Sequence, residues 1–445
     1  MSVSVLWFRR DLRLADNPAL LAAAAEADEV LPLFVVDPTL YDPAGAPRQA
    51  YLLRSLRELD RRLGRRLVVR RGDPVTAVVR LATDIGATGV HCAADHGPYG
   101  SRRDRAVDAA LAEAGIPLVR TGSPYAVAPG RVRKPDGTPY RMFTPFSRAW
   151  GGYGWRGPAG DGSAVRFAAV GEGAGELPAE PEVAAELPAA GEEAALARWA
   201  EFRDERLAGY DTDRDRPDLD ATSHLSVSLK FGELHPRTLL ADLGAGAGPA
   251  TFRTELCWRE FYADVLHHRP ESARDSMHGE VRHDSGAAAD ALFEAWATGR
   301  TGFPLVDAGM RQLLAEGWMH NRVRMLTASF LVKDLHLPWR RGARHFLRHL
   351  VDGDLASNNH GWQWTAGTGT DASPYHRVFN PTTQGERFDP AGDYVRRYVP
   401  QLRAVAGKAV HTLPDGPPDG YPEPIVDHRA EREEALRRYR EIRAG

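Results

Sequence analysis

The chain has 445 residues, of which 43% are hydrophobic and 26% are charged, and its formal net charge at pH 7 is −3. This length and composition exclude a wholly disordered chain and are typical of two or three domains, each with its own core. The small net charge excludes a polycation, so any surface that binds nucleic acid has to be a local patch.

The cysteine content and the N-terminus bear on the cellular compartment. Only Cys92 and Cys257 are present, which cannot form a disulfide framework and is typical of a reducing compartment. The N-terminal sequence MSVSVLWFRR reaches arginine after an apolar run too short for a signal peptide, and no apolar run approaches the length of a membrane span. We therefore expect a cytoplasmic protein without membrane contact.

From residue 1 to about 130, short apolar runs alternate with helical patterns. The runs predicted as strands lie at residues 3–8, 30–36, 66–71, 89–94 and 117–121. The helical patterns between them lie at residues 17–27, 51–63, 74–86 and 104–115. Strands that are apolar throughout are buried on both faces, so this order predicts an α/β domain with a doubly wound parallel sheet. The first strand is not followed by G-x-G-x-x-G, and no Walker A loop is present, so neither usual phosphate-binding loop is expected.

The middle of the chain changes in composition. Residues 131–194 are predicted to be an interdomain linker, because from residue 151 onward they are rich in Gly, Ala, Pro and Glu. After this segment the strand patterns disappear. Helical patterns follow at residues 192–210, 251–268, 304–335 and 343–354. Residues 195–445 are therefore predicted to form an all-α domain.

Several polar and aromatic residues of the helical part share helix faces. Glu255 and Trp258 lie three residues apart on one predicted helix, and Trp318, Asn321 and Met325 follow one stripe of another. Each of these alone is more often an ordinary core or surface residue. Together they predict a mostly apolar cavity with a few orienting polar groups, the usual form of a site for a large ligand.

Other chemistry is less defined by the residues alone. The hydroxyl residues Thr222, Ser223 and Ser226 can bind phosphate at a helix start, although an ordinary N-cap explains them as well. No His, Cys or acid spacing matches a metal site, and none is expected. The Asp352/Asp354 pair, with Arg324 available, is interpreted as a structural ion pair and not as acid–base machinery.

Long segments of the chain resemble the photolyase/cryptochrome family of flavoproteins. They include ELCWREFY, TGFPLVDAGMRQLLAEGWMHNRVRM and DGDLASNNHGWQWTAGTGTDASPYHRVFNPTTQGERFDP, and they occur in the family order through to the C-terminus. The resemblance implies an α/β domain followed by an all-α FAD-binding domain. It places the chain nearest to class I cyclobutane pyrimidine dimer DNA photolyase of the deazaflavin-antenna type.

The resemblance also implies a set of FAD-binding residues. FAD would be folded into a U, and the residues 352–371, which show no clear helical or strand period, would form a polar loop around its ring. Asn358 matches the residue that faces flavin N5, where an amide can accept the N5–H of the reduced states. The implied cofactor-binding residues are Tyr210, Thr222, Ser223, His224, Leu225, Ser226, Arg259, Arg324, Asp352, Asp354 and Asn358.

The activity that the resemblance implies is electron transfer from excited reduced FAD to a flipped-out dimer in UV-damaged DNA. The faces of Trp258 and Trp364 would hold the lesion, and Glu255 would hydrogen-bond a pyrimidine carbonyl. The implied catalytic residues are Glu255, Trp258, Met325, Asn358 and Trp364. The implied DNA-binding residues are Arg214, Trp258, Arg259, Asn321, Arg322, Trp364, Arg377 and Arg387. Phosphate contacts by these arginines predict salt-sensitive binding that is nearly blind to sequence.

Two accessory features also follow from the resemblance. Trp362 and Trp339 match the first two of three relay tryptophans, but the third position lies near Gly286, so we expect slow photoreduction or another electron route. Residues 93–104 match an antenna segment. Asp95 and Arg48 are candidate contacts for 8-hydroxy-5-deazaflavin, with 5,10-methenyltetrahydrofolate or an empty site as the alternatives.

Other functions are less consistent with the sequence. A cryptochrome-like blue-light photoreceptor without repair activity is the main alternative, and the dimer-pocket residues together with the short C-terminus argue against it. A nucleotide-binding hydrolase or transferase would need a phosphate loop, and an interaction scaffold would not need a tryptophan-rich pocket. We expect a monomer without an obligate protein partner.

Overall fold

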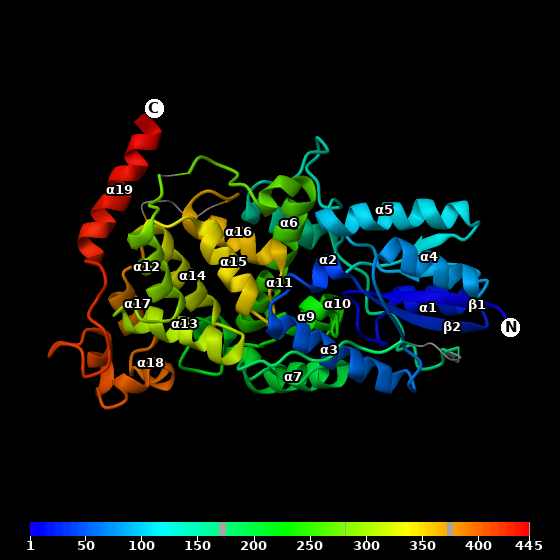
Figure 1. Cartoon of the computed structure of the whole chain (residues 1–445), viewed down its shortest axis with the longest axis horizontal. Helices are drawn as coiled ribbons and strands as arrows, with labels where there is room; N and C mark the ends of the chain where they lie inside the picture. The colour runs from blue at the N-terminus through cyan, green and yellow to red at the C-terminus, as the bar shows by residue number, and fades with distance from the viewer. Residues whose placement is uncertain (169–174, 281, 372–376, 445) are drawn as a thin grey trace. The chain divides into compact units, whose positions relative to one another are not determined.

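The computed structural model describes residues 1–168, 175–280, 282–371 and 377–444. The chain forms two compact units, and each combines segments that are separated along the sequence (Figure 1). The first unit comprises Met1–Val183, Pro188–Ala208 and Ser223–Pro270. The second comprises Ala184–Leu187, Gly209–Thr222 and Glu271–Gly445.

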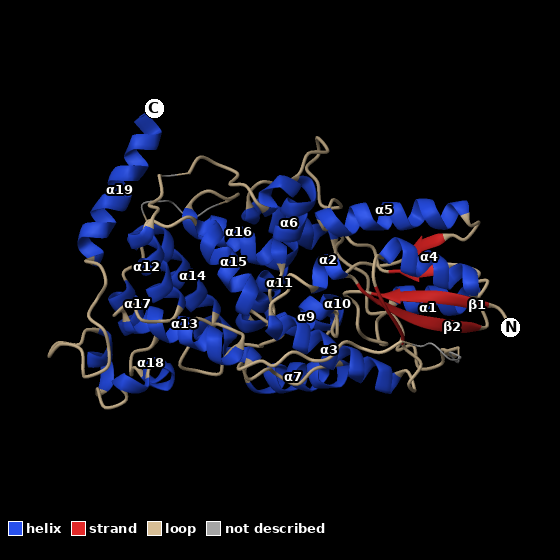
Figure 2. Ribbon diagram, in the orientation of Figure 1, coloured by secondary structure: helices blue, strands red, loops and turns tan. Residues whose placement is uncertain are grey.

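A five-stranded parallel sheet lies in the first unit, and Figure 2 shows it as a single layer of arrows. Its strands are β1 (Val3–Phe8), β2 (Glu29–Val36), β3 (Val68–Arg71), β4 (Val90–Cys92) and β5 (Leu118–Arg120). The order across the sheet is β3-β2-β1-β4-β5, and every neighbouring pair is parallel. The predicted doubly wound α/β fold is thereby confirmed.

The helices that connect the strands are α1 (Pro18–Glu26), α2 (Pro38–Tyr41), α3 (Ala46–Arg62), α4 (Pro74–Asp84) and α5 (Pro98–Glu113). Three of them, α1, α2 and α4, begin at side-chain caps. Asn17 accepts a hydrogen bond from the Leu20 N–H, and Asp73 accepts one from the Thr76 N–H. Proline in the first turn suits such starts because its missing N–H has no helical partner there. The strand order reverses between β1 and β4, and ligands of doubly wound sheets usually bind at such a switch point.

The rest of the first unit combines helices with long irregular segments. It contains α6 (Phe143–Tyr153), α7 (Glu192–Glu205), α9 (Ser226–Phe231), α10 (Pro236–Ala241) and α11 (Ala247–His268). The sequence patterns did not predict α6, which packs against α11 and buries Phe143, Phe146 and Trp150. The buried carboxylate of Glu260 on α11 accepts hydrogen bonds from Trp150 Nε1 at 2.7 Å and from the Val127 N–H at 3.0 Å. This carboxylate therefore fixes α6 and the chain near residue 127 to α11.

The second unit contains helices and connecting loops, and no strand lies among its described residues. Its α-helices are α8 (Tyr210–Asp213), α12 (Ala287–Ala297), α13 (Pro304–Glu316), α14 (Asn321–Ser329), α15 (Trp339–His349), α16 (Leu355–Ala366), α17 (Pro381–Phe388), α18 (Asp393–Tyr398) and α19 (His428–Ala444). The pattern at residues 304–335 is divided at Gly317, whose left-handed φ of 63° ends α13. In the described parts of the chain, no helix combines the length and apolar character that a membrane span requires.

The predicted polar loop at residues 352–371 is wrong, because most of it is the helix α16. The Asp354 carboxylate caps its start by accepting from the Ser357 N–H at 3.1 Å, and Gly367 ends it with a φ of 76°. The helical period was hidden because α16 buries polar residues. Asn359 Nδ2 donates to the Ala273 carbonyl at 2.6 Å, and Gln363 Nε2 donates to the Ser272 carbonyl at 2.8 Å.

A π-helical turn, Phe330–Asp334, follows α14 and buries a lysine. Lys333 is 1% exposed, and its Nζ donates to the Arg377 carbonyl at 2.9 Å. Burial lowers the pKa of Lys333 from its ordinary value of 10.5 to about 8, since removing the ammonium from water disfavours the charged form.

The depressed pKa of Lys333 predicts a pH-dependent stability. Between pH 8 and pH 10.5 the unfolded chain binds more protons at this lysine than the folded chain does, so the folded state gains stability as the pH rises. The gain should be about 3 kcal/mol over this window. Urea unfolding across the window should show this gain in the wild type and lose it in Lys333→Met. The exposed Lys408→Met is the matched control, and an equal loss in that variant would contradict the assignment.

Candidate cofactor and DNA-binding site

An ion pair joins α14 to the segment before α16. Arg324 Nη2 lies 2.8 Å from Asp352 Oδ2, and Arg324 Nε donates to the Met319 carbonyl at 2.7 Å. Asp352 is 7% exposed, whereas the arginine is partly accessible. The interpretation of these two residues as an ion pair is therefore confirmed, and Asp354 is the helix cap already described.

Asn358 on α16 has a fixed amide orientation. Its Nδ2 donates to the Ala343 carbonyl at 3.2 Å and to Asn359 Oδ1 at 2.8 Å, which uses both amide hydrogens. Among the described residues, no hydrogen-bond donor reaches its Oδ1. The side chain thus presents an acceptor, as the sequence prediction for flavin N5–H requires.

The carboxylate of Asp352 provides a test of whether this region suits FAD. Its Oδ1 is buried and has no hydrogen-bond partner among the described residues. A buried acceptor without a donor costs about 1 to 3 kcal/mol, so such an atom suits a ligand that brings an N–H group. Flavin rings carry N–H groups, and these residues therefore fit FAD.

The residues predicted near the FAD diphosphate lie around the start of α9. Ser226 is its first residue, and Ser223 Oγ accepts from the Leu225 N–H at 3.4 Å. His224 adopts a φ of 53°, a left-handed conformation that is uncommon for a residue with a side chain. Thr222 and Tyr210 belong to the second compact unit, whereas residues 223–226 belong to the first.

The residues on α11 that were predicted to line a dimer pocket are partly held by neighbouring side chains and carbonyls. Glu255 and Trp258 lie three residues apart on this helix, as predicted, and the Trp258 ring stacks on Phe143 with centroids 3.6 Å apart. Arg259 Nη1 donates to the Pro124 carbonyl at 3.0 Å and its Nη2 to the Leu229 carbonyl at 3.1 Å. Arg259 therefore holds the backbone at Pro124 and Leu229 against α11, whether or not it also binds a ligand.

The predicted stripe of Trp318, Asn321 and Met325 is only partly observed, because Asn321 and Met325 lie on α14 whereas Trp318 lies in the turn before it. Asn321 Nδ2 lies 4.0 Å from Met325 Sδ. Trp318 precedes this helix, and its ring lies 5.9 Å from the guanidinium carbon of Arg324. Trp364 is half-buried on α16.

Two of the predicted DNA-binding arginines share one aromatic ring. The guanidinium carbons of Arg322 and Arg387 lie 4.6 and 5.0 Å from the centroid of Phe388. Arg322 Nη2 also lies 2.6 Å from Asp215 Oδ2, so a phosphate would have to compete with this carboxylate. Arg214 adjoins the same acid, with Nε 4.0 Å from Asp215 Oδ1. Arg377 is exposed.

The two tryptophans predicted to relay electrons lie on neighbouring helices of the second unit. Trp362 on α16 and Trp339 at the start of α15 are 3% and 1% exposed. The Trp362 ring lies against Gly342, where an added Cβ atom would come within 2.0 Å of it. Gly342 is one helical turn from Trp339, so the Trp362 ring contacts α15 near the turn that carries Trp339. Gly286, the position without a third tryptophan, precedes α12.

The candidate antenna residues lie in the first unit, and Asp95 follows β4. Asp95 Oδ2 lies 3.3 Å from Arg103 Nη2, and the Gly97 N–H donates to its Oδ1 at 3.0 Å. Burial raises the pKa of Asp95, but the charges of Arg9 and Arg103 outweigh it and leave the pKa below its usual value. The carboxylate is thus held as an anion. Arg48 is half-buried near the start of α3.

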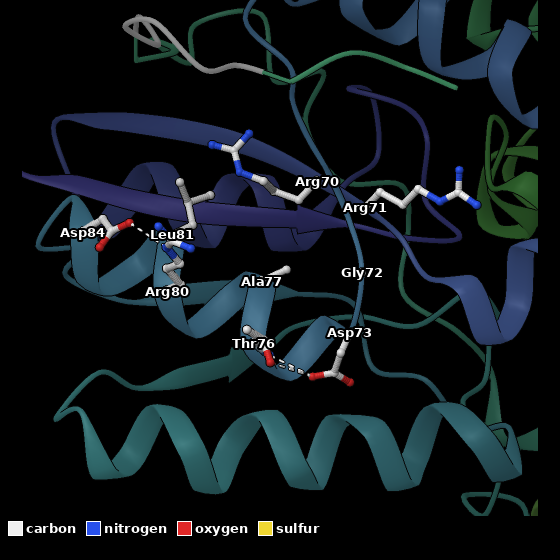
Figure 3. Close-up of a pocket in the computed structure, with 9 residues that line it drawn as sticks. All are labelled: Arg70, Arg71, Gly72, Asp73, Thr76, Ala77, Arg80, Leu81 and Asp84. Carbon is white, nitrogen blue, oxygen red and sulfur yellow. Dashed lines mark hydrogen bonds and ion pairs between the residues drawn. The ribbon is translucent and has the colours of Figure 1, made fainter. Parts of the chain in front are cut away.

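A surface hollow of about 430 Å³ lies between β3 and the start of α4, outside the predicted site (Figure 3). Arg70 and Arg71 extend in opposite directions there, as successive residues of a strand do. Arg80 pairs with Asp84 at 3.7 Å, and the Asp73 carboxylate already caps α4. An anion would therefore meet a capped helix end, and we assign no ligand to this hollow.

A parallel α/β sheet unit and a helical unit that suits a flavin together define a two-part flavin-binding protein. Residues 4–155 match the family model for DNA photolyase, and residues 252–441 match the model for the FAD binding domain of DNA photolyase. The chain belongs to the DNA photolyase family.

Relatives support this assignment over almost the whole chain. A deoxyribodipyrimidine photo-lyase from Streptomyces griseus is 44% identical, with 96% of this chain and 97% of the relative covered. The crystal structure of a bacterial class III photolyase from Agrobacterium tumefaciens matches with a TM-score of 0.94 and 37% identity, covering 100% of this chain and 98% of that one. An archaeal photolyase from Sulfolobus tokodaii, described with two FAD molecules, matches with a TM-score of 0.87 and 30% identity, covering 99% and 100%.

The family assignment from sequence is confirmed, whereas the class I subtype stays a prediction because one similar structure is named as class III. Sequence reasoning missed several residues that hold the site. These are Phe143 under Trp258, Asp215 beside Arg322, Phe388 beside two arginines, and the Ala343 carbonyl that orients Asn358. No motif could have indicated them, since each contacts at least one partner that is far away in sequence.

Proposed function

We propose that this protein is a deoxyribodipyrimidine photo-lyase that uses light to split cyclobutane pyrimidine dimers in UV-damaged DNA. The single observation that carries the proposal is its similarity, across both units, to relatives that bear this name. The Asp352 acceptor and the fixed Asn358 amide support the FAD-dependent part.

The protein's residues have distinct roles in this reaction. Bound FAD supplies the electron that light excites. Asp352, held by Arg324, accepts a ring N–H, and Asn358 Oδ1 accepts at N5. Tyr210, Thr222 to Ser226 and Arg259 hold the remainder of the cofactor.

The residues that meet DNA fall into two groups. Trp258, Trp364 and Met325 contact the extruded dimer by their flat or apolar surfaces, and Glu255 hydrogen-bonds a pyrimidine carbonyl. Arg214, Arg322, Arg377 and Arg387 contact phosphates, and Asn321 adds a polar contact. This division predicts that lesion recognition depends on structure and not on flanking sequence.

The antenna is the least defined part of the proposal. We infer a second chromophore near Arg48 and Asp95, with 8-hydroxy-5-deazaflavin as the first candidate and 5,10-methenyltetrahydrofolate as the second. The archaeal relative with two FAD molecules adds a flavin to the compounds to be tested. Mass spectrometry of the released chromophores distinguishes the deazaflavin from the folate, and two FAD per chain instead of one would identify a second flavin.

The repair assay tests the function directly. Purified protein with reduced FAD is mixed with dimer-containing oligonucleotide and exposed to blue light, and restored thymines are measured against a dark control. Light-dependent restoration is expected, and Glu255→Ala should slow it. FAD binding without any repair would instead favour a cryptochrome-like photoreceptor.

Arg322 gives a sharper test of the DNA contacts. Arg322→Ala should weaken binding to dimer-containing DNA and reduce the slope of log affinity against log salt by about 1, because one phosphate contact is lost. Asp215→Asn should strengthen binding, since it frees Arg322 from its ion pair. Binding is measured by fluorescence anisotropy at several salt concentrations. The exposed Arg344→Ala is the control, and an equal change in its slope would refute a specific role for Arg322.

A further inference from the structure

A hydrogen-bonded chain leads from one relay tryptophan to an acid. The indole of Trp339 is 1% exposed, and its Nε1–H donates to Ser276 Oγ at 2.9 Å. The Ser276 hydroxyl donates in turn to Glu280 Oε1. Indole can only donate, whereas a hydroxyl both accepts and donates, so this chain has a single direction.

The hydrogen-bonded series ends at the Glu280 carboxylate, which can accept a proton. Arg340 Nη1 lies 2.6 Å from Glu280 Oε1, and His283 Nε2 lies 3.5 Å from its Oε2. Partial burial raises the pKa of Glu280, but the hydrogen bonds from Ser276 and Arg340 outweigh it and keep the carboxyl ionised. Its side chain is 25% exposed, so a proton that reaches it can pass to water.

The electrostatics around Trp339 also favour loss of its proton once the ring is oxidised. An indole that has lost one electron is a much stronger acid than neutral indole, because the ring then carries a positive charge. The Arg340 guanidinium carbon lies 4.9 Å from the centroid of the Trp339 ring. A cation at this distance repels the positive charge of the oxidised ring and does not repel the neutral radical, so it favours loss of the proton.

We propose that Ser276 and Glu280 form the proton exit of Trp339 during light-driven reduction of FAD. Light-excited oxidised FAD is the oxidant. Trp362 gives it one electron and recovers one from Trp339. The oxidised Trp339 transfers its Nε1 proton to Ser276 Oγ, which passes its own proton to Glu280 Oε1. The products are a neutral Trp339 radical, a protonated Glu280 and FAD with one added electron.

This inference rests on the proposed relay role of Trp362 and Trp339. Without a third relay tryptophan, the positive charge stays on Trp339, and loss of its proton is the step that removes this charge. Return of the electron from FAD is slowed once the proton has left, since a neutral radical is a weaker electron acceptor than the radical cation. Photoreduction can then proceed with two tryptophans.

Trp296 does not offer an equivalent exit. Its ring centroid lies 6.0 Å from that of Trp362, but it is 0% exposed and its Nε1 donates to the Thr327 carbonyl at 3.0 Å. A main-chain carbonyl is a very weak base and has no proton to pass on. Of these two indoles, the hydrogen bonding therefore favours Trp339 as the site of proton loss.

Transient absorption of the FAD-loaded protein tests the proposal, because the radical cation and the neutral radical of tryptophan absorb at different wavelengths. After a flash on oxidised FAD, Ser276→Ala and Glu280→Gln should each slow conversion of cation to neutral radical on the order of 10²-fold. Ser276→Thr should restore the rate, since it keeps a hydroxyl. Asp290→Asn is the charge-matched control and should leave the rate unchanged. It removes a carboxylate of α12 that pairs with Arg341, and Arg341 lies on the same helix as Trp339.

The outcomes separate this inference from the function on which it rests. A radical that loses its proton at the wild-type rate in both variants overturns the proton exit and leaves the relay intact. Wild-type protein that binds FAD and forms no tryptophan radical overturns the relay and the proton exit together, while dimer repair by chemically reduced protein can still confirm the photo-lyase. Far-ultraviolet circular dichroism and bound FAD show whether each variant is folded.

Discussion

Asp352→Ala should release FAD from the purified protein and abolish light-dependent repair. The substitution removes the buried acceptor that awaits a ring N–H and leaves Arg324 without its carboxylate partner. A hydrogen bond to a charged group contributes about 1.5 to 3 kcal/mol, so FAD affinity should fall roughly 10- to 100-fold. The ratio of flavin to protein absorbance after gel filtration measures the loss.

Two further variants make the Asp352 result specific. Asp352→Asn keeps an acceptor without the charge and should retain more FAD than the alanine variant. Asp290→Ala, which removes a surface carboxylate from the same unit, should retain all of it. Full FAD occupancy in Asp352→Ala would show that this carboxylate does not bind the cofactor.

Asp307→Ala should cause the largest loss of stability among the substitutions considered. The Asp307 side chain is fully buried, and its Oδ1 accepts from the N–H and hydroxyl of Thr301, both at 2.7 Å. Its Oδ2 accepts from Tyr421 Oη at 2.7 Å and from the Gly302 N–H at 3.1 Å. Removal leaves four buried donors unpaired, and the free energy of unfolding should fall by about 3 to 5 kcal/mol.

Urea unfolding followed by circular dichroism checks this value. Asp393→Ala is the matched control, because its carboxylate is 65% exposed and pairs with Arg396 on the surface. Its effect should stay within about 0.5 kcal/mol. A loss at Asp307 no larger than that at Asp393 would show that the four donors find other acceptors, such as water.

The elements that sequence patterns predicted well are those buried by apolar residues. Strands β1 and β2 are apolar and buried over most of their length, and that pattern arises when both faces of a parallel sheet are covered. Helix α16 was not predicted because many of its buried side chains are polar and hydrogen-bonded. Its buried face therefore shows no apolar residues at helical spacing. Helix α6 lies in a stretch rich in glycine and proline, where propensity is low and packing on α11 decides the conformation.

The site divides along similar lines. The Glu255 and Trp258 spacing, the Asn321 and Met325 stripe and the Asp352 ion pair depend on local geometry or on one clear partner, and these were predicted. Asp215 and Ser276 were not predicted. Each meets its partner only through tertiary folding, and a single serine or aspartate carries no periodicity that distinguishes it from other surface residues.

Helix α16 carries Asn358, Trp362 and Trp364 within two turns, and one face of the helix is tied to the carbonyls of Ser272 and Ala273. Under the proposed function, Asn358 contacts the cofactor, Trp362 relays electrons and Trp364 contacts the lesion. One helix thus couples cofactor contact, electron relay and lesion contact, so selection on any one of these functions is constrained by the other two. Descendants of this gene should therefore vary α16 as a block, and laboratory evolution of one trait should need compensating changes outside the helix.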